Sequence, residues 1–287
     1  RGPRAWCRAR CGRCVMHLAL ATAASVVAAD AGGLTFAHWN PHWQCFVESP
    51  ACAAHATAAL TSLLSSGGDF VNVVELETTK YEPPAGWASI APFETCGPAK
   101  TGDWDTLFYY EKAWQLKQSK IGCVVDGRSF AAGVFQSRSD PALVLTVLGA
   151  HYPQTLNAST HAYLQAVGNL SAALKPLATE RAVLLADTNT EGPAAAAASA
   201  SHNGVNKTNA QILQDLGLWP AKSSAAPPAA PLFKGCCASD NFSWQGDRIV
   251  ANFGTVVSSR TLFDPAPDWA VFSGSEFHKG VLLTLKP

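Results

Sequence analysis

Polar side chains that can bind a metal or move a proton stand at the ends of apolar segments along this sequence. Four apolar runs finish on such a residue, a later run opens with one, and a histidine precedes the last run. These residues are Asn40, Glu75, His151, Asp187 with Asn189, Asp247 and His278. Strand ends at one edge of a sheet lie close together, and ligand sites favour such edges. We therefore expect these side chains to form one site.

The residue types match the needs of phosphate-ester hydrolysis. That reaction requires neutralised phosphoryl oxygens, an activated water and a protonated leaving oxygen. A hard divalent cation prefers oxygen ligands, which Glu75 and Asn40 supply. A carboxylate such as Asp187 can orient and deprotonate water, and an uncharged donor such as Asn189 can stabilise the pentacovalent state.

His278 and Asp247 complete this set as a pair for proton transfer. A histidine held by a carboxylate has its tautomer fixed and its pKa raised. Proton transfer by such a group is the acid–base step that ester cleavage needs.

Each of these residues also has a simpler structural explanation. Asn40 could form an Asx turn before Pro41. His151 could be a hydrogen-bonded core histidine, and Asp247 with Arg248 could be a surface ion pair of little energetic value. Three other histidines are interpreted as structural or surface groups, although the second is near enough to Asn40 to contact a substrate: His38, His42 and His55.

The elements that must position these residues follow from the apolar pattern. Apolar runs rich in Val, Leu and Ile predict strands over residues 34–40, 69–75, 106–110, 133–136, 142–151, 181–187, 247–252 and 281–286. Helical composition predicts helices over 53–65, 160–174 and 209–218. Because strands dominate and helices stand between them, we expect a layered α/β sandwich and not a regular βαβ winding.

Charge excludes one simple class of nucleic-acid binder. The chain has 287 residues, with 21 basic and 21 acidic side chains, so its formal net charge is zero. No global basic field therefore gathers nucleic acid, although a local basic groove is compatible with these numbers. The hydrophobic fraction of 48% is enough for one large α/β domain.

The N-terminal segment, residues 1–31, has the pattern of a leader with a secretory signal peptide. Five arginines precede Met16, residues 18–29 are apolar and uncharged, and small residues around 29–31 supply a cleavage site. A buried helix of the domain is the alternative. We expect residues 32–287 to form the folded domain, and we expect the protein to be secreted or to reside in the lumen of the secretory pathway.

Cysteines and glycosylation sequons favour the same route. Six cysteines follow the leader, and six allow fifteen pairings. The pairs Cys45–Cys52 and Cys96–Cys123 are favoured because each closes a short loop, whereas adjacent Cys236 and Cys237 are not expected to bond each other. Four Asn-x-Ser/Thr sequons point to a glycoprotein in an oxidising compartment: Asn157, Asn169, Asn206 and Asn241.

Six short segments carry a family resemblance that spans residues 34–286. They are the run ending His-Trp-Asn40, Asp-Phe-Val-Asn-Val-Val-Glu75, Leu-Gly-Ala-His151, Leu-Leu-Ala-Asp187-Thr-Asn189, Asp247-Arg-Ile-Val and Ser275-Glu-Phe-His278-Lys-Gly-Val281. In order and wording they resemble the deoxyribonuclease I-like family of endonucleases, exonucleases and phosphatases. The resemblance implies an α/β (α+β) fold, a four-layer α/β/β/α sandwich of two mixed sheets flanked by helices.

The resemblance also implies a metal-dependent active site. The implied catalytic residues are His151, Asp187, Asn189, Asp247 and His278. Asn40, Glu75 and Glu276 would hold Mg²⁺ or Mn²⁺, with Ca²⁺ as a further possibility. In this picture His151 and Asn189 contact the phosphate and Asp187 orients the attacking water.

This sequence departs from the family pattern at several positions. Ala186 replaces a glycine, and Val74 replaces a glutamine before Glu75. In the last motif Phe277 falls where the family has an aspartate, and Glu276 takes over that role only if the turn shifts.

The predicted function is hydrolysis of phosphate esters by a secreted metal-dependent enzyme. A phosphodiesterase or nuclease comes first, and a sphingomyelinase-like lipid phosphodiesterase or a small-molecule phosphatase is the alternative. A third hypothesis is a binding module that keeps the fold without activity, because of Phe277. The expected partner is a phosphate ester in a nucleic acid, a phospholipid or a small molecule. We expect no transmembrane segment in the domain, and a monomer is favoured.

Overall fold

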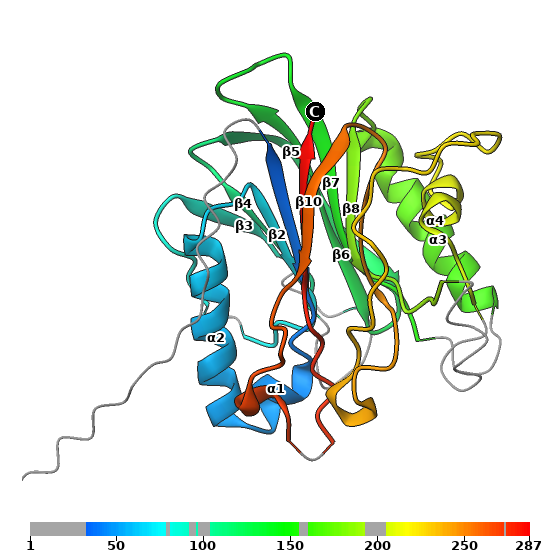
Figure 1. Ribbon diagram of the computed structural model, residues 1–287. Coiled ribbons are helices and arrows are strands. Elements are labelled where there is room, and N and C mark those ends of the chain that lie inside the picture. The colour runs from blue at the N-terminus through cyan, green and yellow to red at the C-terminus, as the bar shows by residue number, and fades with distance from the viewer. Residues whose placement is uncertain are drawn as a thin grey trace, which may run out of the picture.

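Two mixed β-sheets face each other in the computed structural model of the protein (Figure 1). The structure describes residues 33–78, 81–91, 96, 104–154, 160–192, 205–272 and 274–287. The strands of the first sheet are β1 (Leu34–Trp39), β2 (Phe70–Val73), β3 (Trp87–Ile90), β4 (Thr106–Tyr110), β10 (Thr255–Thr261) and β11 (Val281–Lys286). Their order is β10-β11-β1-β2-β4-β3.

The second sheet follows the chain in order, β5-β6-β7-β8-β9. Its strands are β5 (Trp114–Val125), β6 (Arg128–Ser137), β7 (Val144–His151), β8 (Ala182–Asp187) and β9 (Asp247–Ala251). Each sheet holds one parallel pair, β1 with β2 and β7 with β8, and its remaining pairs are antiparallel.

Helices cover the outer faces of both sheets. The α-helices are α1 (Trp43–Val47), α2 (Pro50–Ser65), α3 (Thr160–Leu174) and α4 (Asn209–Asp215), and the 3₁₀ helices are η1 (Lys175–Leu177), η2 (Ala238–Asp240) and η3 (Asp268–Ala270). Leu60 and Leu64 of α2 pack on the first sheet, and Leu170 of α3 and Leu213 of α4 pack on the second. These contacts confirm the predicted four-layer α/β/β/α sandwich of two mixed sheets.

A third apolar cluster fills the space between the sheets, and alternation along the strands builds it. In β1 the side chain of Phe36 points to the second sheet, whereas Trp39 packs with α2. In β8 the side chain of Leu185 points inward and Leu184 packs with α3. Successive side chains of a strand face opposite sides of a sheet, so each buried strand supplies two layers of core.

At one end of the sandwich the inward-facing side chains are polar and not apolar. His151, Asp187 and Asp247 stand next to one another on β7, β8 and β9, since His151 pairs with Asp187 and Asp187 pairs with Asp247. All three share the inward-facing parity of their strands. The carboxyl ends of β1 and β2 lead to Asn40 and Glu75 from the opposite sheet. The inner layer is thus apolar through its middle and polar at this end.

Local signals fix where the helices begin. The Ser49 side chain accepts a hydrogen bond from the backbone N–H of Cys52, and Pro50 occupies the first turn of α2. Thr208 and Gln211 form a reciprocal capping box at the start of α4. The disulfide between Cys45 and Cys52 then joins α1 to α2.

Most predicted elements are present, and three strands were not predicted. The runs predicted as strands correspond to β1, β2, β4, β6, β7, β8, β9 and β11, and the three predicted helices to α2, α3 and α4. The missed strands β3, β5 and β10 carry few buried side chains. An exposed strand lacks the apolar run that identified the others, so sequence pattern alone did not reveal it.

The disulfide predictions are partly confirmed. Cys45–Cys52 and Cys96–Cys123 are bonded, as predicted. The expectation that Cys236 and Cys237 do not bond each other is wrong in this structure, where the two sulfur atoms are joined. A β-bridge between Cys236 and Trp244 holds this tight segment in place.

Several predictions fall on parts of the chain outside the described residues. These include the leader over residues 1–31 and the sequon at Asn157. The Asn169, Asn206 and Asn241 sequons lie on exposed positions, and their glycosylation stays a prediction. Within the described part of the chain, every helix is too short or too polar to span a membrane.

Candidate active site

Glu75 lies at the centre of a set of hydrogen-bond donors. Its Oε2 accepts a hydrogen bond from the backbone N–H of Trp43 at 2.8 Å, and its Oε1 lies 3.3 Å from Nη1 of Arg128. The imidazoles of His42 and His151 approach it at 3.5 Å and 3.6 Å. The carboxylate is 3% exposed, so these donors offset the cost of burying its charge.

Asn40 connects Glu75 to Asp187. Its Nδ2 donates to Asp187 Oδ2 at 3.1 Å and lies 3.4 Å from Glu75 Oε1. Its Oδ1 accepts a hydrogen bond from the backbone N–H of His42 at 2.8 Å, which is an Asx turn. Asn40 therefore has both roles: its Oδ1 forms the Asx turn, and its Nδ2 contacts the carboxylates of the site.

Asp187 contacts both catalytic histidine candidates as well as Asn40. Besides Asn40, its Oδ2 lies 3.5 Å from His151 Nε2 and 3.6 Å from His278 Nδ1. Its Oδ1 accepts a hydrogen bond from the backbone N–H of Asn189 at 3.0 Å. The Asn189 side chain donates in turn to the carbonyl of Tyr152 at 2.8 Å, so it holds the turn after β8 in place.

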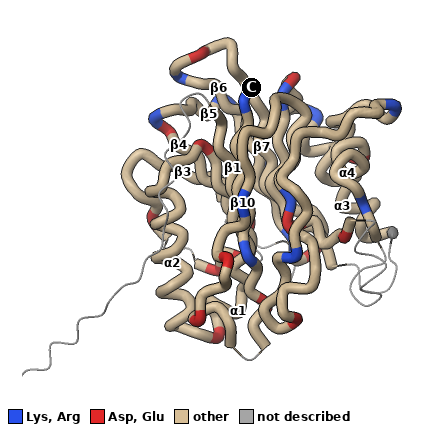
Figure 2. Tube along the Cα trace, in the orientation of Figure 1, with Lys and Arg blue, Asp and Glu red and all other residues tan. Residues whose placement is uncertain are grey.

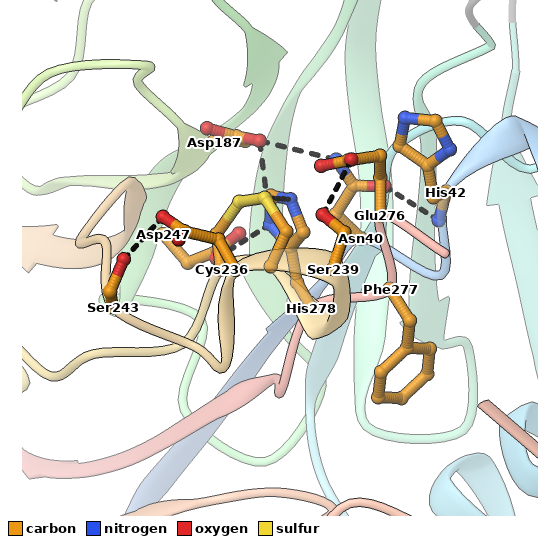
Figure 3. Close-up of a disulfide and its surroundings, with 12 residues drawn as sticks. Asn40, His42, Asp187, Cys236, Ser239, Ser243, Asp247, Glu276, Phe277 and His278 are labelled. Carbon is orange, nitrogen blue, oxygen red and sulfur yellow. Dashed lines mark hydrogen bonds and ion pairs between the residues drawn. A yellow bond between two sulfur atoms is a disulfide. The ribbon is translucent and has the colours of Figure 1, made fainter. Parts of the chain in front are cut away.

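Asp247 and His278 form the predicted pair. His278 Nδ1 lies 2.9 Å from Asp247 Oδ2, and both side chains are almost fully buried (Figure 3). Burial alone would lower the pKa of His278, but the carboxylates of Asp247, Asp187 and Glu75 raise it to about 9. Burial would raise the pKa of Asp247, but its hydrogen-bonded imidazole partners hold it well below the usual range. The imidazolium form of His278 is therefore favoured at neutral pH.

His38 was interpreted as a structural or surface group and is instead a second partner of Asp247. Its Nε2 lies 3.1 Å from Asp247 Oδ1, and its side chain is fully buried. Asn72 Nδ2 lies 3.3 Å from His38 Nδ1 and 3.1 Å from the carbonyl oxygen of Leu185. Because a carbonyl only accepts, that atom of Asn72 is the NH₂ group. His38 Nδ1 is then an acceptor, and Nε2–H donates to Asp247.

The signal for His38 was present in the sequence. Leu34, Phe36 and His38 share one face of β1, so the inward parity that buries Leu34 and Phe36 also directs His38 toward the second sheet. The signal for Arg128, a second missed residue, was absent. It opens β6 after a turn, and only the tertiary fold brings its Nη1 within 3.2 Å of His151 Nδ1 and next to Glu75.

The last motif places its three residues in different surroundings. His278 points into the site, and Phe277 points away from it (Figure 3). Phe277 is 1% exposed and packs against aromatic rings that include Trp39 and Trp269. Glu276 is partly exposed at the rim, where its Oε1 accepts a hydrogen bond from Ser239 Oγ at 2.6 Å.

Arg248 is not the surface ion-pair partner considered for Asp247. It lies on the opposite face of β9, is 2% exposed, and donates to Thr188, Thr190 and Asn209. Burial lowers its pKa to about 10. Since Thr188 and Thr190 flank Asn189, this guanidinium supports the turn that carries Asn189.

Backbone strain concentrates at this end of the sandwich. Six described non-glycine residues have positive φ angles, and three of these belong to the site: His42, Glu75 and Asn189, with angles of 66°, 56° and 47°. The left-handed region is unfavourable for side chains of this size, and such residues cluster at functional sites. The strain therefore supports a functional role for this cluster.

The donor set fits a hard divalent cation. Glu75 offers carboxylate oxygens, and Asp187 adds another carboxylate on the far side of Asn40. Asn40 would offer its amide oxygen by releasing the N–H of His42. Arg128 and the His278 imidazolium supply two positive charges against the three buried carboxylates of Glu75, Asp187 and Asp247. A cation would therefore offset the remaining negative charge.

Solved structures share the fold of this chain over most of its length. An endonuclease/exonuclease/phosphatase from Bacteroides vulgatus has a TM-score of 0.60 at 12% identity, covering 88% of this chain and 98% of the other. Zebrafish (D. rerio) TDP2 in complex with a single-strand DNA product has a TM-score of 0.57 at 11% identity, covering 89% and 99%. A mannosyl-6-phosphatase from Bacteroides thetaiotaomicron has a TM-score of 0.57 at 12% identity, covering 87% and 98%.

Comparisons of sequence find no relative, whereas comparisons of structure find many. No protein-family model matches the chain, and no curated protein sequence is significantly similar to it. Identities of this size carry the fold alone. With the order of the two sheets and the convergence of their polar strand ends, the structural neighbours show that this chain has the deoxyribonuclease I-like fold of the endonuclease/exonuclease/phosphatase family.

Proposed function

We propose that the protein is a divalent-metal-dependent phosphoesterase, and a phosphodiesterase in the first place. The observation that carries this proposal is the link from the Asp247–His278 pair through Asp187 and Asn40 to Glu75. One end of that chain is a proton donor and the other is a set of oxygen ligands. Cleavage of a phosphate ester needs both within the span of one phosphate group.

Glu75 and Asn40 would hold the cation, with Glu276 joining them from the rim. Mg²⁺ or Mn²⁺ suits these oxygen donors, and Ca²⁺ is a further candidate. When bound, the cation would neutralise charge on the phosphoryl oxygens.

His278 acts as the general acid in this proposal. Its raised pKa keeps the imidazolium available at neutral pH, and Asp247 fixes the ring so that Nε2 is the nitrogen that passes a proton. Asp187 orients the attacking water through the oxygen that faces the middle of the site. Arg128 and His151, which lie 3.2 Å apart, would contact the phosphate oxygens.

His38 has a positioning role in this scheme. By donating to Asp247 Oδ1, it keeps that carboxylate ionised and turned so that Oδ2 faces His278. Asn72 fixes the tautomer of His38 in turn.

Neighbours that share this fold act in different settings. One neighbour is TDP2 in complex with a single-strand DNA product and another is a mannosyl-6-phosphatase, so the fold alone does not select between such substrates. In the view of Figure 2, lysines and arginines are scattered among acidic residues without forming one basic face. This distribution and the zero net charge favour a lipid or small-molecule phosphate ester as the second candidate.

A binding module without activity remains the alternative from another class. It rests on Phe277, whose side chain packs in the core at the position where the resembled motif has an acid. The rest of the site keeps its hydrogen bonds, so the proposal treats Phe277 as a change in metal coordination and not as loss of the site.

Hydrolysis of bis-(p-nitrophenyl) phosphate tests the proposal. Turnover in Mg²⁺ or Mn²⁺ should stop on addition of EDTA and return when the metal is restored. His278→Ala should lose at least 10²-fold in kcat, as expected for removal of a general acid. Absence of metal-dependent turnover across the pH range would leave the binding module. A panel of DNA, RNA, sphingomyelin and sugar phosphates would then separate the substrate classes.

We also propose that the protein enters the secretory pathway, because of the leader over residues 1–31 and the sequons. Expression of the full chain in a eukaryotic secretory host tests this. Glycosidase-sensitive protein in the medium is the expected result, and retention of an unprocessed, unglycosylated chain inside the cell would contradict it.

A further inference from the structure

Two sulfur atoms lie beside the catalytic histidine of the proposed site. Cys237 Sγ is 3.7 Å from His278 Nε2, and the sulfurs of Cys236 and Cys237 and a ring nitrogen of His278 lie within 4.8 Å of one another (Figure 3). All three residues are buried, with exposed fractions of 2%, 6% and 3%. The hydrolysis proposed above gives the cysteines no role.

The backbone holds the two cysteines in this position. The segment around them pairs with the segment that carries His278: Ala238 N–H donates to the Phe277 carbonyl at 3.1 Å, and Lys279 N–H donates to the Gly235 carbonyl at 2.9 Å. On the other side, Trp244 N–H donates to the Cys236 carbonyl at 2.7 Å. These hydrogen bonds involve main-chain atoms, so they place the sulfur atoms beside His278 whichever redox state the cysteines have.

His278 presents the right nitrogen to the sulfurs. Its Nδ1 faces Asp247 Oδ2 at 2.9 Å, so in the neutral ring the proton is on Nδ1 and the lone pair is on Nε2. A histidine that donates one ring N–H to a carboxylate and offers the other nitrogen to a metal is the usual arrangement in zinc sites. His38 steadies the same carboxylate from its other oxygen at 3.1 Å.

The distances also suit a tetrahedral zinc ion. Zinc binds thiolate sulfur at about 2.3 Å and imidazole nitrogen at about 2.0–2.1 Å, so tetrahedral geometry separates the two ligand atoms by roughly 3.5 Å. The Cys237 Sγ to His278 Nε2 distance of 3.7 Å is close to that value. Two sulfurs and one imidazole form a soft ligand set, unlike the oxygen donors around Glu75.

We propose that Cys236, Cys237 and His278 form a binding site for a thiophilic divalent cation, Zn²⁺ in the first place, once a thiol reductant has opened the Cys236–Cys237 disulfide. Two reductant thiols are oxidised to a disulfide, and their two electrons and two protons convert the protein disulfide into two cysteine thiols. Zn²⁺ then displaces the two thiol protons and accepts the lone pair of His278 Nε2. Two Zn–S bonds and one Zn–N bond form, and a third proton leaves when His278 starts as the imidazolium.

Occupancy of this site inhibits the phosphoesterase, a consequence that rests on the function proposed above. The nitrogen bound to zinc is the one that must pass a proton to the leaving oxygen. Zinc at the sulfurs and substrate turnover at His278 are therefore mutually exclusive. In the disulfide form both sulfurs lack the charge that binds zinc, so the oxidised enzyme is insensitive at this site.

The test measures zinc binding directly. The full chain is treated with dithiothreitol, desalted without oxygen, and titrated with Zn²⁺ against a chromophoric chelator. Reduced wild type should bind one more Zn²⁺ per chain than reduced Cys236→Ser/Cys237→Ser. The double variant keeps the other seven cysteines of the full chain and Glu75, so it accounts for zinc bound elsewhere. Asp247→Asn should weaken the additional site by about 10–100-fold.

A second measurement needs no variant. Zn²⁺ should slow alkylation of Cys236 and Cys237 in the reduced wild type, while the other cysteines react at an unchanged rate, as read by peptide mass spectrometry. Equal zinc uptake by wild type and the double variant, or no protection of these two thiols, would overturn the proposal. Neither readout uses turnover. An inactive protein would therefore refute the proposed function, while the zinc site would still be tested by these two measurements.

Phosphoesterase turnover can be measured on the same samples. In saturating Mg²⁺, one equivalent of Zn²⁺ should lower turnover by reduced wild type at least tenfold and leave oxidised wild type at its zinc-free rate. Inhibition of equal size in the reduced double variant would assign the effect to zinc at Glu75 and would contradict the mutual exclusion argued here.

Discussion

The Asp247–His278 pair makes the sharpest prediction about the proposed activity. The pKa of His278 is about 9, raised from an ordinary value of 6.5, and the nearest cause is the Asp247 carboxylate at 2.9 Å. A difference of this size corresponds to about 3 kcal/mol between the two protonation states. Asp247→Asn removes the charge and keeps the shape, and burial then opposes the smaller raising effects of Asp187 and Glu75, so the pKa of His278 should fall back toward its ordinary value.

The change in rate follows from the protonated fraction. At pH 8 a group with a pKa of about 9 is roughly 90% protonated, and one with a pKa of about 6.5 is roughly 3% protonated. Loss of the general acid alone should therefore lower kcat/KM at pH 8 on the order of 30-fold, and the variant should lose activity above about pH 6.5 instead of about pH 9.

The assay is kcat/KM for bis-(p-nitrophenyl) phosphate against pH, with NMR titration of the His278 ring as an independent readout. Asp140→Asn is the matched control, because Asp140 is exposed in a turn outside the site and undergoes the same chemical change. The control should keep the wild-type profile. If Asp247→Asn keeps the alkaline limit of the wild type, the carboxylate does not set the proton affinity of His278, and the proposed acid role is wrong.

Three further predictions concern stability, each measured by urea unfolding. Arg248→Ala should cost about 3–5 kcal/mol, because it removes the guanidinium donor from buried Thr188 and Thr190 and from partly buried Asn209. Gly149→Ala should destabilise by at least about 1–3 kcal/mol, because an added Cβ would clash with Asn72 Oδ1, whereas Gly168→Ala in α3 meets open space and should stabilise by about 0.5–1 kcal/mol. Since the pKa of His278 is raised on folding, its contribution to stability should be complete below about pH 6.5 and be lost as the pH rises through about 9, a trend that Asp247→Asn should remove.

The sequence was most informative where a buried strand ends in a polar residue. The β7 and β8 segments are apolar nearly throughout, so His151 and Asp187 stood out at their ends. Parallel pairing of these strands then makes their ends coincide, since His151 is opposite Asp187 in the sheet. Apolar runs predict buried strands, and the edge rule for α/β sheets predicts the convergence.

The sequence was less informative where tertiary contacts decide. β5 is mostly exposed, so its side chains record few packing constraints. Arg128 follows a turn and looks like a surface residue, yet the antiparallel pairing of β6 with β7 brings it to His151. The contact joins residues 23 positions apart, and no local pattern specifies it.

Gly149 and His38 show how the prediction could have gone further. Both lie on the inner face of a strand, and the glycine leaves room for Asn72, which fixes the tautomer of His38. The alternation of apolar residues along β1 is visible in the sequence and predicts that His38 faces inward. Its partner Asp247 comes from the other sheet, 209 residues later, and only the packing of the two sheets joins them.

Phe277 and the cysteine pair together explain why the surroundings of the last motif could not be predicted from the sequence. The motif is continuous in sequence, but its residues face different layers: Phe277 packs with Trp39 in the α2 layer, whereas His278 faces Asp247 between the sheets. Adjacent residues in an extended segment point to opposite sides, so an acid at 277 would lie in the apolar core beneath the site. The acid of the motif that faces solvent at this edge is Glu276, and the sulfur of Cys237 lies 3.7 Å from Nε2 of His278. The histidine of the motif and a cysteine pair that the motif does not contain therefore lie side by side at this edge.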